Sequence, residues 1–381
     1  MKFIHKIILL ILSIIYIFIP KNNKKIIFTS YKNMKYNFCS RIFFEFLLQQ
    51  ENEYDIKFVI NDNELRDYLN KNIGNYFITS YKFKDVVECL SSRIWISSCK
   101  PIYSSPLSLI GHININVWHG IPLKKVGIND KHQSKIKKLI YKYYYSWCFY
   151  SLFVVSSEEV KKLIHSSFNV KNNKIFISGS LIGENFSKSI DLEQNNKLKN
   201  ILIKSRKNKV LYAPTYRDGG KTQFFPFNGL DKNEFEKFLK KNEITIYIRP
   251  HHLEKNYKKY IEWEGIEYLG SDIISEITYY LENFNFLITD YSSILFDYML
   301  TNGNLILLPY DYDIYKKERG LNFSIDEINY GDIATTLEDF KNSLLQRNKK
   351  NTNKDKIIDR FHSIRKDQCT TLLKKIKIYD K

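Results

Sequence analysis

One histidine in the chain stands where a buried strand is predicted to end. The segment Val117–Lys124 reads Val-Trp-His-Gly-Ile-Pro-Leu-Lys and follows an apolar run that is typical of a strand. An unperturbed histidine has a pKa of about 6.5, so His119 could take a proton from an attacking hydroxyl. Gly120 lets the backbone turn and a substrate approach closely. A histidine that only holds the turn in place fits the same pattern.

Two further motifs carry basic side chains after predicted strands in the second half of the chain. Arg217 follows the run Val210–Pro214, and Arg249 and His251 follow the run Ile244–Ile248. Guanidinium groups bind phosphate oxygens through paired N–H donors. Arg217 could therefore contact a phosphate, and Arg249 with His251 could bind a diphosphate. Taken singly, such residues are more often structural or lie on the surface.

A fourth motif has the composition of a strand, a tight turn and a helix start. Asp290, Ser292 and Ser293 follow the run Phe286–Thr289 and precede an apolar stretch of helical length. A helix N-terminus has unsatisfied N–H groups and a positive dipole end, so it can bind phosphate. Ordinary serine capping is the alternative. Arg319, which precedes a turn-forming glycine, is either another phosphate contact or part of a charged loop.

Several familiar kinds of catalytic site are absent from the sequence. It contains no Walker loop, no GxGxxG fingerprint, no HExxH and no GxSxG element. Asp311-Tyr312-Asp313 matches the Asp-x-Asp pattern of metal-dependent sugar transferases, but two acidic residues at this spacing are common, and we expect no metal site. The five cysteines are scattered without zinc spacing, which predicts reduced thiols in a cytoplasmic protein.

The elements that must position these motifs are short apolar runs alternating with segments of helical length. Nearly continuous apolar runs are typical of strands buried on both faces of a parallel sheet. Ligands of such sheets bind beyond the carboxyl ends of the strands, where the motifs stand. We expect an α/β fold with two doubly wound Rossmann-type domains facing a cleft. The predicted strands are Ile26–Ser30, Ile56–Ile60, Tyr76–Ser80, Ile94–Ser98, Ile113–Trp118, Leu152–Ser156, Ile175–Ser178, Val210–Pro214, Ile244–Ile248, Ile266–Leu269, Phe286–Thr289 and Leu305–Leu308.

The predicted boundaries divide the chain into four parts. Residues 1–23 form an apolar membrane-associating segment, 24–200 an acceptor-side domain, 201–350 a donor-binding domain, and 351–381 a basic C-terminal helix. Predicted helices include Arg41–Gln50, Glu158–His165, Leu192–Ser205, Lys232–Lys241 and Ser292–Thr301, and the tail from Asp355 to Ile378 has a basic amphipathic pattern.

The charge and the N-terminal segment both indicate an anionic partner. The formal net charge of +18 suits nucleic acid, anionic lipid or a phosphate-rich substrate, although lysine is abundant throughout the chain. The apolar run Ile7–Ile19 would be about 20 Å long as a helix, shorter than the roughly 30 Å hydrocarbon core. Lysines on both sides predict a segment lying in the cytoplasmic leaflet. A buried helix and a signal anchor are the alternatives.

Taken together, the motifs resemble the CDP-glycerol glycerophosphotransferase family of teichoic acid and capsule biosynthesis. The resemblance extends from about Lys24 to Asp332. It implies a GT-B-like fold and a peripheral, monotopic enzyme at the cytoplasmic face of the membrane, with a lipid-linked acceptor. The matching segments are Ile26–Ser30 with Phe43–Leu48, Trp118-His119-Gly120 with Pro122-Leu123-Lys124, Tyr212–Thr215 with Arg217-Asp218, Arg249 with His251, Thr289–Ser293 with Phe296-Asp297-Tyr298, and Glu318-Arg319-Gly320.

The resemblance also implies roles for the residues in these segments. His119 would activate the acceptor hydroxyl, which would attack the β-phosphorus of CDP-glycerol with release of CMP. His251 would be a second catalytic residue at the donor diphosphate. The other donor contacts would be Arg217, Arg249, Asp290, Ser292, Ser293 and Arg319, with Gly120 and Lys124 on the acceptor side. No metal ligand, further cofactor or nucleic-acid partner is implied.

One segment departs from the family pattern, and other functions fit part of the sequence. Family members commonly carry Gly-x-Pro-Arg-Asn-Asp where this chain has Gly179–Glu184, which lacks the proline and the arginine. Donor and acceptor identity, including ribitol phosphate, are therefore open. A GT-B glycosyltransferase using a nucleotide sugar is the main alternative. A non-catalytic basic protein that binds nucleic acid or anionic lipid would explain the charge but not His119 and His251.

Overall fold

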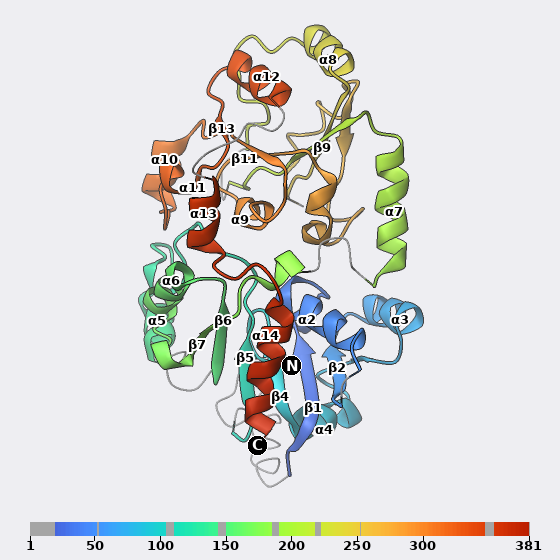
Figure 1. Ribbon diagram of the computed structural model, residues 1–381, viewed down its shortest axis with the longest axis vertical. Helices are drawn as coiled ribbons and strands as arrows, with labels where there is room; N and C mark the ends of the chain where they lie inside the picture. Colours follow the sequence, from blue (N-terminus) through green and yellow to red (C-terminus); the bar gives the residue numbers. More distant parts are fainter. Residues whose placement is uncertain are drawn as a thin grey trace. The chain divides into compact units, whose positions relative to one another are not determined.

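The chain forms two parallel sheets, each with its own helices (Figure 1). The structure is a computed structural model that describes residues 20–51, 53–103, 110–143, 150–184, 190–217, 222–251, 253–346 and 354–380. Contacts divide the chain into two units. Unit 1 comprises the residues up to His119, Val126–Glu184 and the stretch from His362, and unit 2 comprises Gly120–Lys125 and Asn185–Phe361. The predicted α/β class is confirmed, and the facing cleft stays a prediction.

Unit 1 is built on a sheet with the strand order β3-β2-β1-β4-β5-β6-β7. Its strands are β1 (Asn22–Thr29), β2 (Asp55–Val59), β3 (Phe77–Ile78), β4 (Ser92–Ser97), β5 (Ile113–Asn116), β6 (Leu152–Val155) and β7 (Ile175–Ile177). Its α-helices are α2 (Phe38–Leu48), α3 (Asn63–Asn72), α4 (Phe83–Ser91), α5 (Lys135–Leu139), α6 (Glu158–Phe168) and α14 (Gln368–Lys377).

Unit 2 repeats the same winding with the strand order β10-β9-β8-β11-β12-β13. Its strands are β8 (Asn208–Tyr212), β9 (Ile244–Ile248), β10 (Ile266–Tyr268), β11 (Phe286–Thr289), β12 (Asn304–Leu307) and β13 (Asp332–Ile333). Its α-helices are α7 (Leu192–Ile203), α8 (Lys232–Lys241), α9 (Ile294–Tyr298), α10 (Tyr312–Glu318), α11 (Ile325–Ile328), α12 (Leu337–Leu345) and α13 (Lys354–Phe361). Numbered within the unit, this is the Rossmann order 3-2-1-4-5-6.

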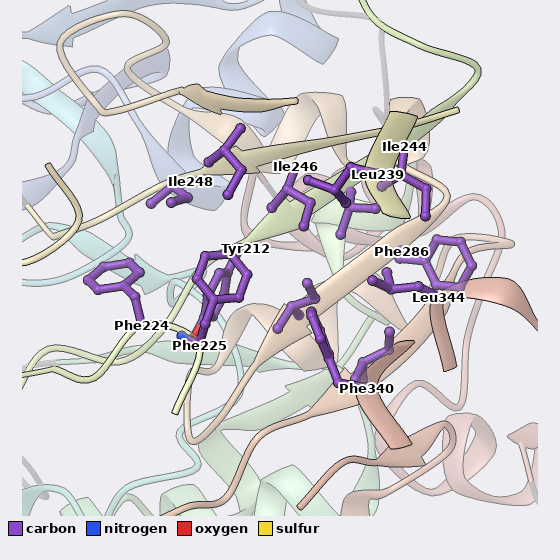
Figure 2. Packing of buried hydrophobic residues seen from close by; sticks show 14 of the residues in the cluster. Tyr212, Phe224, Phe225, Leu239, Ile244, Ile246, Ile248, Phe286, Phe340 and Leu344 are labelled. Carbon is purple, nitrogen blue, oxygen red and sulfur yellow. The ribbon is translucent and has the colours of Figure 1, made fainter. Parts of the chain in front are cut away.

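The core of unit 2 explains why its strands were recognisable in the sequence. Every residue of β9 is buried, because helices cover a parallel sheet on both faces. Figure 2 shows Leu239 of α8 beside Ile244 and Ile246 of β9, with Phe340 of α12 in the same cluster. Burial of each such side chain contributes about 1.5–3 kcal/mol. Continuous burial therefore produces continuous apolar runs, and all twelve predicted strands are present.

Strand β13, helix α9 and one domain boundary differ from the sequence prediction. The two-residue strand β13 was not predicted, since Asp332 and Ile333 are too few to form a pattern. Helix α9 covers only Ile294–Tyr298 of the predicted 292–301. The predicted boundary near residue 200 also differs from the contact division, because α7 groups with unit 2.

The predicted single helix over 351–381 is wrong, because the tail forms two helices in different units. Phe361 at the end of α13 packs in unit 2 on Phe296 and Phe323, with ring centroids 4.8 and 4.9 Å away. In the connection, Ser363 donates its backbone N–H to the Ser156 carbonyl at 3.2 Å in unit 1. Asp367 then adopts a left-handed conformation, which an α-helix cannot continue through.

The membrane prediction for residues 1–23 falls almost entirely outside the described residues. Among the helices within the described ranges, none has the length and apolar character required to cross a bilayer. Four of the five cysteines are described, and Cys39, Cys89, Cys99 and Cys369 are free thiols. Cys148 lies outside the described residues.

The docking of α14 on unit 1 can be tested at Gly179. This residue has φ +88, and a Cβ on it would lie 2.6 Å from Gln368 Cγ and closer still to the Ile364 carbonyl oxygen. Gly179→Ala should combine left-handed strain of about 1–2 kcal/mol with an overpacking cost of about 1–3 kcal/mol. Thermal unfolding measures the loss.

Gly111→Ala is the matched control in the same unit. Its φ of +81 carries similar strain, but its nearest neighbour is the flexible Lys21 side chain at 3.1 Å. We expect Gly179→Ala to lower the melting temperature by clearly more than Gly111→Ala. Equal shifts would contradict the packing of α14 against the segment after β7.

Candidate active site

The strand order of each sheet reverses at one position, between β1 and β4 in unit 1 and between β8 and β11 in unit 2. Open parallel sheets bind ligands outside the carboxyl ends of their strands at such a position. In unit 1, Ser98 follows β4 and His119 lies three residues after β5. In unit 2, Thr215 follows β8 and Asp290 follows β11. The motif residues thus form one group in each unit.

His119 in unit 1 has a defined tautomer. Its Nδ1 lies 2.8 Å from the carbonyl oxygen of Ser98. A carbonyl oxygen only accepts hydrogen bonds, so Nδ1 carries the proton and Nε2 of the neutral ring has the lone pair. Desolvation lowers the pKa of His119 below its usual value of 6.5, and the hydrogen bond to Ser98 only partly opposes this. Nε2 is therefore unprotonated at neutral pH and able to accept a proton.

Hydrogen bonds and a ring contact fix the position of His119. Ser98 Oγ accepts the backbone N–H of Ser40 at the start of α2, at 2.7 Å. Trp118 has φ +55, a conformation that is costly for a residue with a side chain. Its N–H is held by Asn116 Oδ1 at 2.7 Å. Phe38 also packs on the imidazole, with 5.2 Å between the ring centroids.

The segment Gly120–Lys125 groups with unit 2, although His119 groups with unit 1. Asn322 holds it through its Nδ2, which donates to the carbonyls of Pro122 at 2.8 Å and Lys124 at 2.9 Å. Gly120 has φ +121 with no atom near its would-be Cβ, so the backbone conformation rather than space requires glycine. Lys124 Nζ lies 5.8 Å from the centre of the Tyr315 ring. The predicted contacts of Gly120 and Lys124 with an acceptor stay predictions.

Arg217 forms a buried ion cluster at the switch position of unit 2. Its Nη2 pairs with Asp290 Oδ2 at 2.8 Å, and its Nε and Nη2 bind the Asp311 carboxylate at 2.9 and 3.0 Å. Its Nη1 donates to the Thr215 carbonyl at 2.6 Å. Burial alone would lower the pKa of Arg217, but hydrogen bonding to Asp311 and the charge of Asp290 raise it above its usual range.

Asp290 ties together the loops that follow two neighbouring strands. Its Oδ1 accepts the backbone N–H groups of Thr215 at 2.8 Å and Tyr291 at 2.6 Å. The guanidinium of Arg217 also lies against the ring of Tyr291, 5.2 Å from its centre. In the described structure Arg217 and Asp290 thus organise this edge of the sheet, and their predicted contacts with a diphosphate stay predictions.

Arg249 also binds protein carbonyls. Its Nη1 donates to Leu269 at 3.2 Å and to Ile274 at 2.9 Å, and its Nη2 donates to Ser275 at 3.3 Å. Desolvation lowers the pKa of Arg249, opposed by the charge of nearby Glu276. Arg249 therefore shapes the loop after β10.

His251 is exposed and lies flat on Tyr216, with ring centroids 4.6 Å apart and planes 26° apart. Its Nδ1 accepts the backbone N–H of Leu253 at 3.4 Å. The neutral ring consequently carries its proton on Nε2, the opposite tautomer to His119. A histidine in this form can donate a hydrogen bond to an anionic oxygen. Its neighbour His252 lies outside the described residues.

The remaining predicted residues lie on the turns before α9 and after α10. Ser293 is the N-cap of α9 and has helical dihedral angles without a side-chain capping bond. Ser292 is half-buried and Ser293 is exposed, which keeps both hydroxyls near the surface. Arg319 is the half-buried C-cap of α10, and its N–H donates to the Tyr315 carbonyl at 2.9 Å. Their phosphate contacts stay predictions.

Two structural residues of the site had no usable signal in the sequence. Asp311 was recognisable only as part of an Asp-x-Asp pattern, yet it binds Arg217, which is 94 positions away. Asn322 holds the segment after His119 from about 200 positions away. Across the described residues, no group of three or more His, Cys, Asp or Glu side chains is placed to hold a metal ion.

Comparison with known proteins gives a consistent set of relatives. The chain is 26% identical over 339 residues to a teichoic acid poly(glycerol phosphate) polymerase of Bacillus spizizenii, covering 84% of this chain and 82% of that protein. It is 23% identical over 325 residues to a teichoic acid glycerol-phosphate transferase of Staphylococcus aureus, covering 78% and 77%. A teichoic acid glycerol-phosphate primase of Bacillus subtilis is 29% identical over 215 residues, about half of each chain (54% and 52%).

A solved structure shares the fold, and a family model matches the sequence. The structure of the wall teichoic acid polymerase TagF superposes with a TM-score of 0.74 at 20% identity, covering 94% of this chain and 90% of that one. The family model described as CDP-Glycerol:Poly(glycerophosphate) glycerophosphotransferase matches residues 11–366. Because this match spans both units, the chain belongs to the CDP-glycerol:poly(glycerophosphate) glycerophosphotransferase family.

Proposed function

We propose that the chain transfers glycerol phosphate from CDP-glycerol to a hydroxyl of a lipid-linked acceptor and releases CMP. The observation that carries the proposal is the family match over residues 11–366. Support at the level of chemistry comes from His119, whose tautomer and lowered pKa suit a general base. The pathway is teichoic acid synthesis, as for the relatives named above.

In the proposed reaction, His119 Nε2 takes the proton of the acceptor hydroxyl as its oxygen attacks the β-phosphorus. The new bond joins that oxygen to phosphorus, and the bond from phosphorus to the bridging oxygen of the diphosphate breaks. CMP leaves with the electron pair. Phosphoryl transfer depends mainly on positioning and on donors fixed at the phosphoryl oxygens. His251 Nε2–H, the turn with Ser292 and Ser293, and Arg319 are the donors proposed here.

The Arg217 cluster has a supporting role in this proposal. Arg217 faces two carboxylates, so its positive charge is already balanced in the described structure. It fixes Thr215 in the loop after β8 and Asp290 in the loop after β11. The second of these loops also carries Ser292 and Ser293. We infer that the cluster sets the shape of the donor pocket and that its loss weakens donor binding.

The proposal also includes a contact with the membrane, for which α5 has a suitable surface. Helix α5 and the turn after it present Ile136, Leu139, Ile140 and Tyr143, which are 71%, 53%, 46% and 62% exposed. Their spacing of i, i+3, i+4 and i+7 places them on one helical face. Residues 131–143 contain Lys131, Lys135, Lys137, Lys138 and Lys142 and no acidic residue. An exposed apolar face among lysines suits an anionic lipid surface at the cytoplasmic side of the membrane.

The base assignment predicts the effect of His119→Ala. With CDP-glycerol and a lipid-linked acceptor, CMP release should fall by about 10²–10⁴-fold, because proton transfer by a positioned base contributes that much. CDP-ribitol and a panel of nucleotide sugars are tested in parallel with the parent chain. Release from a nucleotide sugar alone would overturn the donor assignment.

His165→Ala is the matched control for His119→Ala. His165 lies in the same unit and also binds a carbonyl through Nδ1, that of Val170 at 2.8 Å, but it is exposed on α6. Its loss should leave CMP release unchanged.

The lowered pKa of His119 predicts the pH dependence of the reaction. The value of kcat/KM should stay flat through neutral pH and fall only below the usual histidine pKa of 6.5. An acid limb above pH 6.5, or equal losses in both variants, would contradict the assignment.

The supporting role of the Arg217 cluster predicts different effects at Asp311 and Asp313. Asp311→Ala leaves a buried guanidinium with one partner fewer, which costs about 2 kcal/mol or more. It should lower the melting temperature and raise the KM for CDP-glycerol. Asp313→Ala, at an exposed position, should change neither. If both variants lose activity and both recover with added Mn²⁺ or Mg²⁺, the pair is a metal site instead.

The membrane proposal predicts that α5 contributes to lipid binding. Ile136→Glu combined with Leu139→Glu should weaken binding of the full chain to phosphatidylglycerol vesicles at least about tenfold, since it removes buried apolar area and adds repulsion. Phe83→Glu with Leu345→Glu is the control, because these residues are 72% and 50% exposed on other elements. Unchanged cosedimentation of the α5 variant would refute a contact at this face.

A further inference from the structure

A basic groove lies beside α7 in unit 2, and none of the residues proposed for catalysis lines it. Its volume is about 640 Å³. The polar residues that line it include Asn195, Lys199, Lys207, Lys209, Tyr280 and Asn283. Lys199 and Lys207 are exposed, and Lys209 is half-buried. All of these residues belong to the described part of the chain.

The position of the groove separates it from the donor site. Lys207 directly precedes β8, Lys209 is its second residue, and Asn283 lies just before β11. In parallel strands the amino ends share one edge, so the groove lies at the edge opposite Thr215 and Asp290. Five residues of β8 at about 3.3 Å each separate the two edges by roughly 17 Å. A single donor molecule bound at the carboxyl edge would not fill the groove.

The charge of this groove differs from that of its neighbour on the other side of α7. No carboxylate is among its lining residues, which all lie in described segments. The neighbouring groove, of about 690 Å³, is lined by Glu264 and Glu267 as well as by lysines. Arg206, which lines both, pairs with Glu264 at 2.6 Å. Lys199, Lys207 and Lys209 therefore give the first groove a local excess of positive charge.

The wall formed by α7 is fixed to the rest of unit 2. Tyr280 donates its hydroxyl to Asn195 Oδ1 at 2.7 Å, and Ser275 donates its N–H to Gln194 at 3.2 Å. Leu198 and Leu202 are 2% and 8% exposed. Lys199 thus extends from an anchored helix and Lys209 from strand β8, so little backbone entropy is lost when these lysines bind an anion.

We propose that this groove binds a segment of the glycerol phosphate polymer, holding the chain while its end is extended. The proposal rests on the proposed function, because the polymer is the product of that reaction. Its repeating phosphodiesters carry one negative charge each and complement the charge of Lys199, Lys207 and Lys209 in the lining. Single-stranded nucleic acid is typically bound with aromatic side chains on which its bases stack. The only aromatic residue of the lining is Tyr280, which is 5% exposed and already hydrogen-bonded.

The test combines a binding assay with two activity assays on the full chain. The variant carries Lys199→Glu, Lys207→Glu and Lys209→Glu, and the control carries Lys237→Glu, Lys241→Glu and Lys258→Glu at exposed positions outside the groove. Oligo(glycerol phosphate) of several repeats is titrated by calorimetry, with glycerol phosphate as the monomer. We expect the groove variant to lose at least about tenfold in oligomer affinity, and the parent affinity to fall with salt.

The activity assays separate this site from the catalytic one. With an acceptor of one repeat, CMP release should be the same in the parent, the control and the groove variant, while products from a long acceptor should be shorter in the groove variant. Unchanged oligomer binding and product length would overturn the proposal, as would equal losses in the control.

Two further outcomes separate this proposal from its alternatives. Loss of binding to phosphatidylglycerol vesicles with intact oligomer binding would assign the lysines to lipid instead. Failure of the parent to release CMP would overturn the proposed function, whereas the binding assay tests the groove independently.

Discussion

Parallel strand pairing is the constraint on which both units depend. Each sheet is buried on both faces by helices, so polar side chains that do chemistry can stand only at its edges. The winding brings the carboxyl ends of β8, β9 and β11 to one edge of unit 2, and those of β4 and β5 to one edge of unit 1. His119, Thr215, Arg249 and Asp290 all occupy such positions.

Electrostatic balance distinguishes the arginines that bind protein groups in the described structure from the side chains that lie nearer the surface. Arg217 is surrounded by Asp290, Asp311 and the Thr215 carbonyl, and Arg249 by three carbonyls. Moving a guanidinium from water into the protein is costly, and the charges and hydrogen bonds of these partners offset that cost. The same contacts hold the loops in place. His251 and Ser293 are exposed, and Ser292 and Arg319 are half-buried. These four are the residues that the proposed function assigns to the donor.

The two histidines differ in a way that only their hydrogen bonds determine. His119 donates through Nδ1 to Ser98, and His251 accepts through Nδ1 from Leu253. The first ring offers a lone pair on Nε2 and the second an N–H donor, and the proposed transfer to a hydroxyl uses both. Burial of His119 keeps its lone pair available at neutral pH, while exposure of His251 leaves its ring facing solvent.

The sequence by itself determined the strands, the α/β class and the motif positions. Strands that are buried on both faces are apolar along their whole length, so they can be recognised without knowing which strand each one pairs with. It also indicated the family, since several motifs in the same order are specific even when each alone is weak. Only the tertiary structure decided which partners each side chain has. Asp311 meets Arg217, and Asn322 meets the segment after His119, across separations that no local pattern records. The break between α13 and α14 was likewise invisible, because a basic amphipathic pattern specifies an apolar face but not the surface that this face will cover.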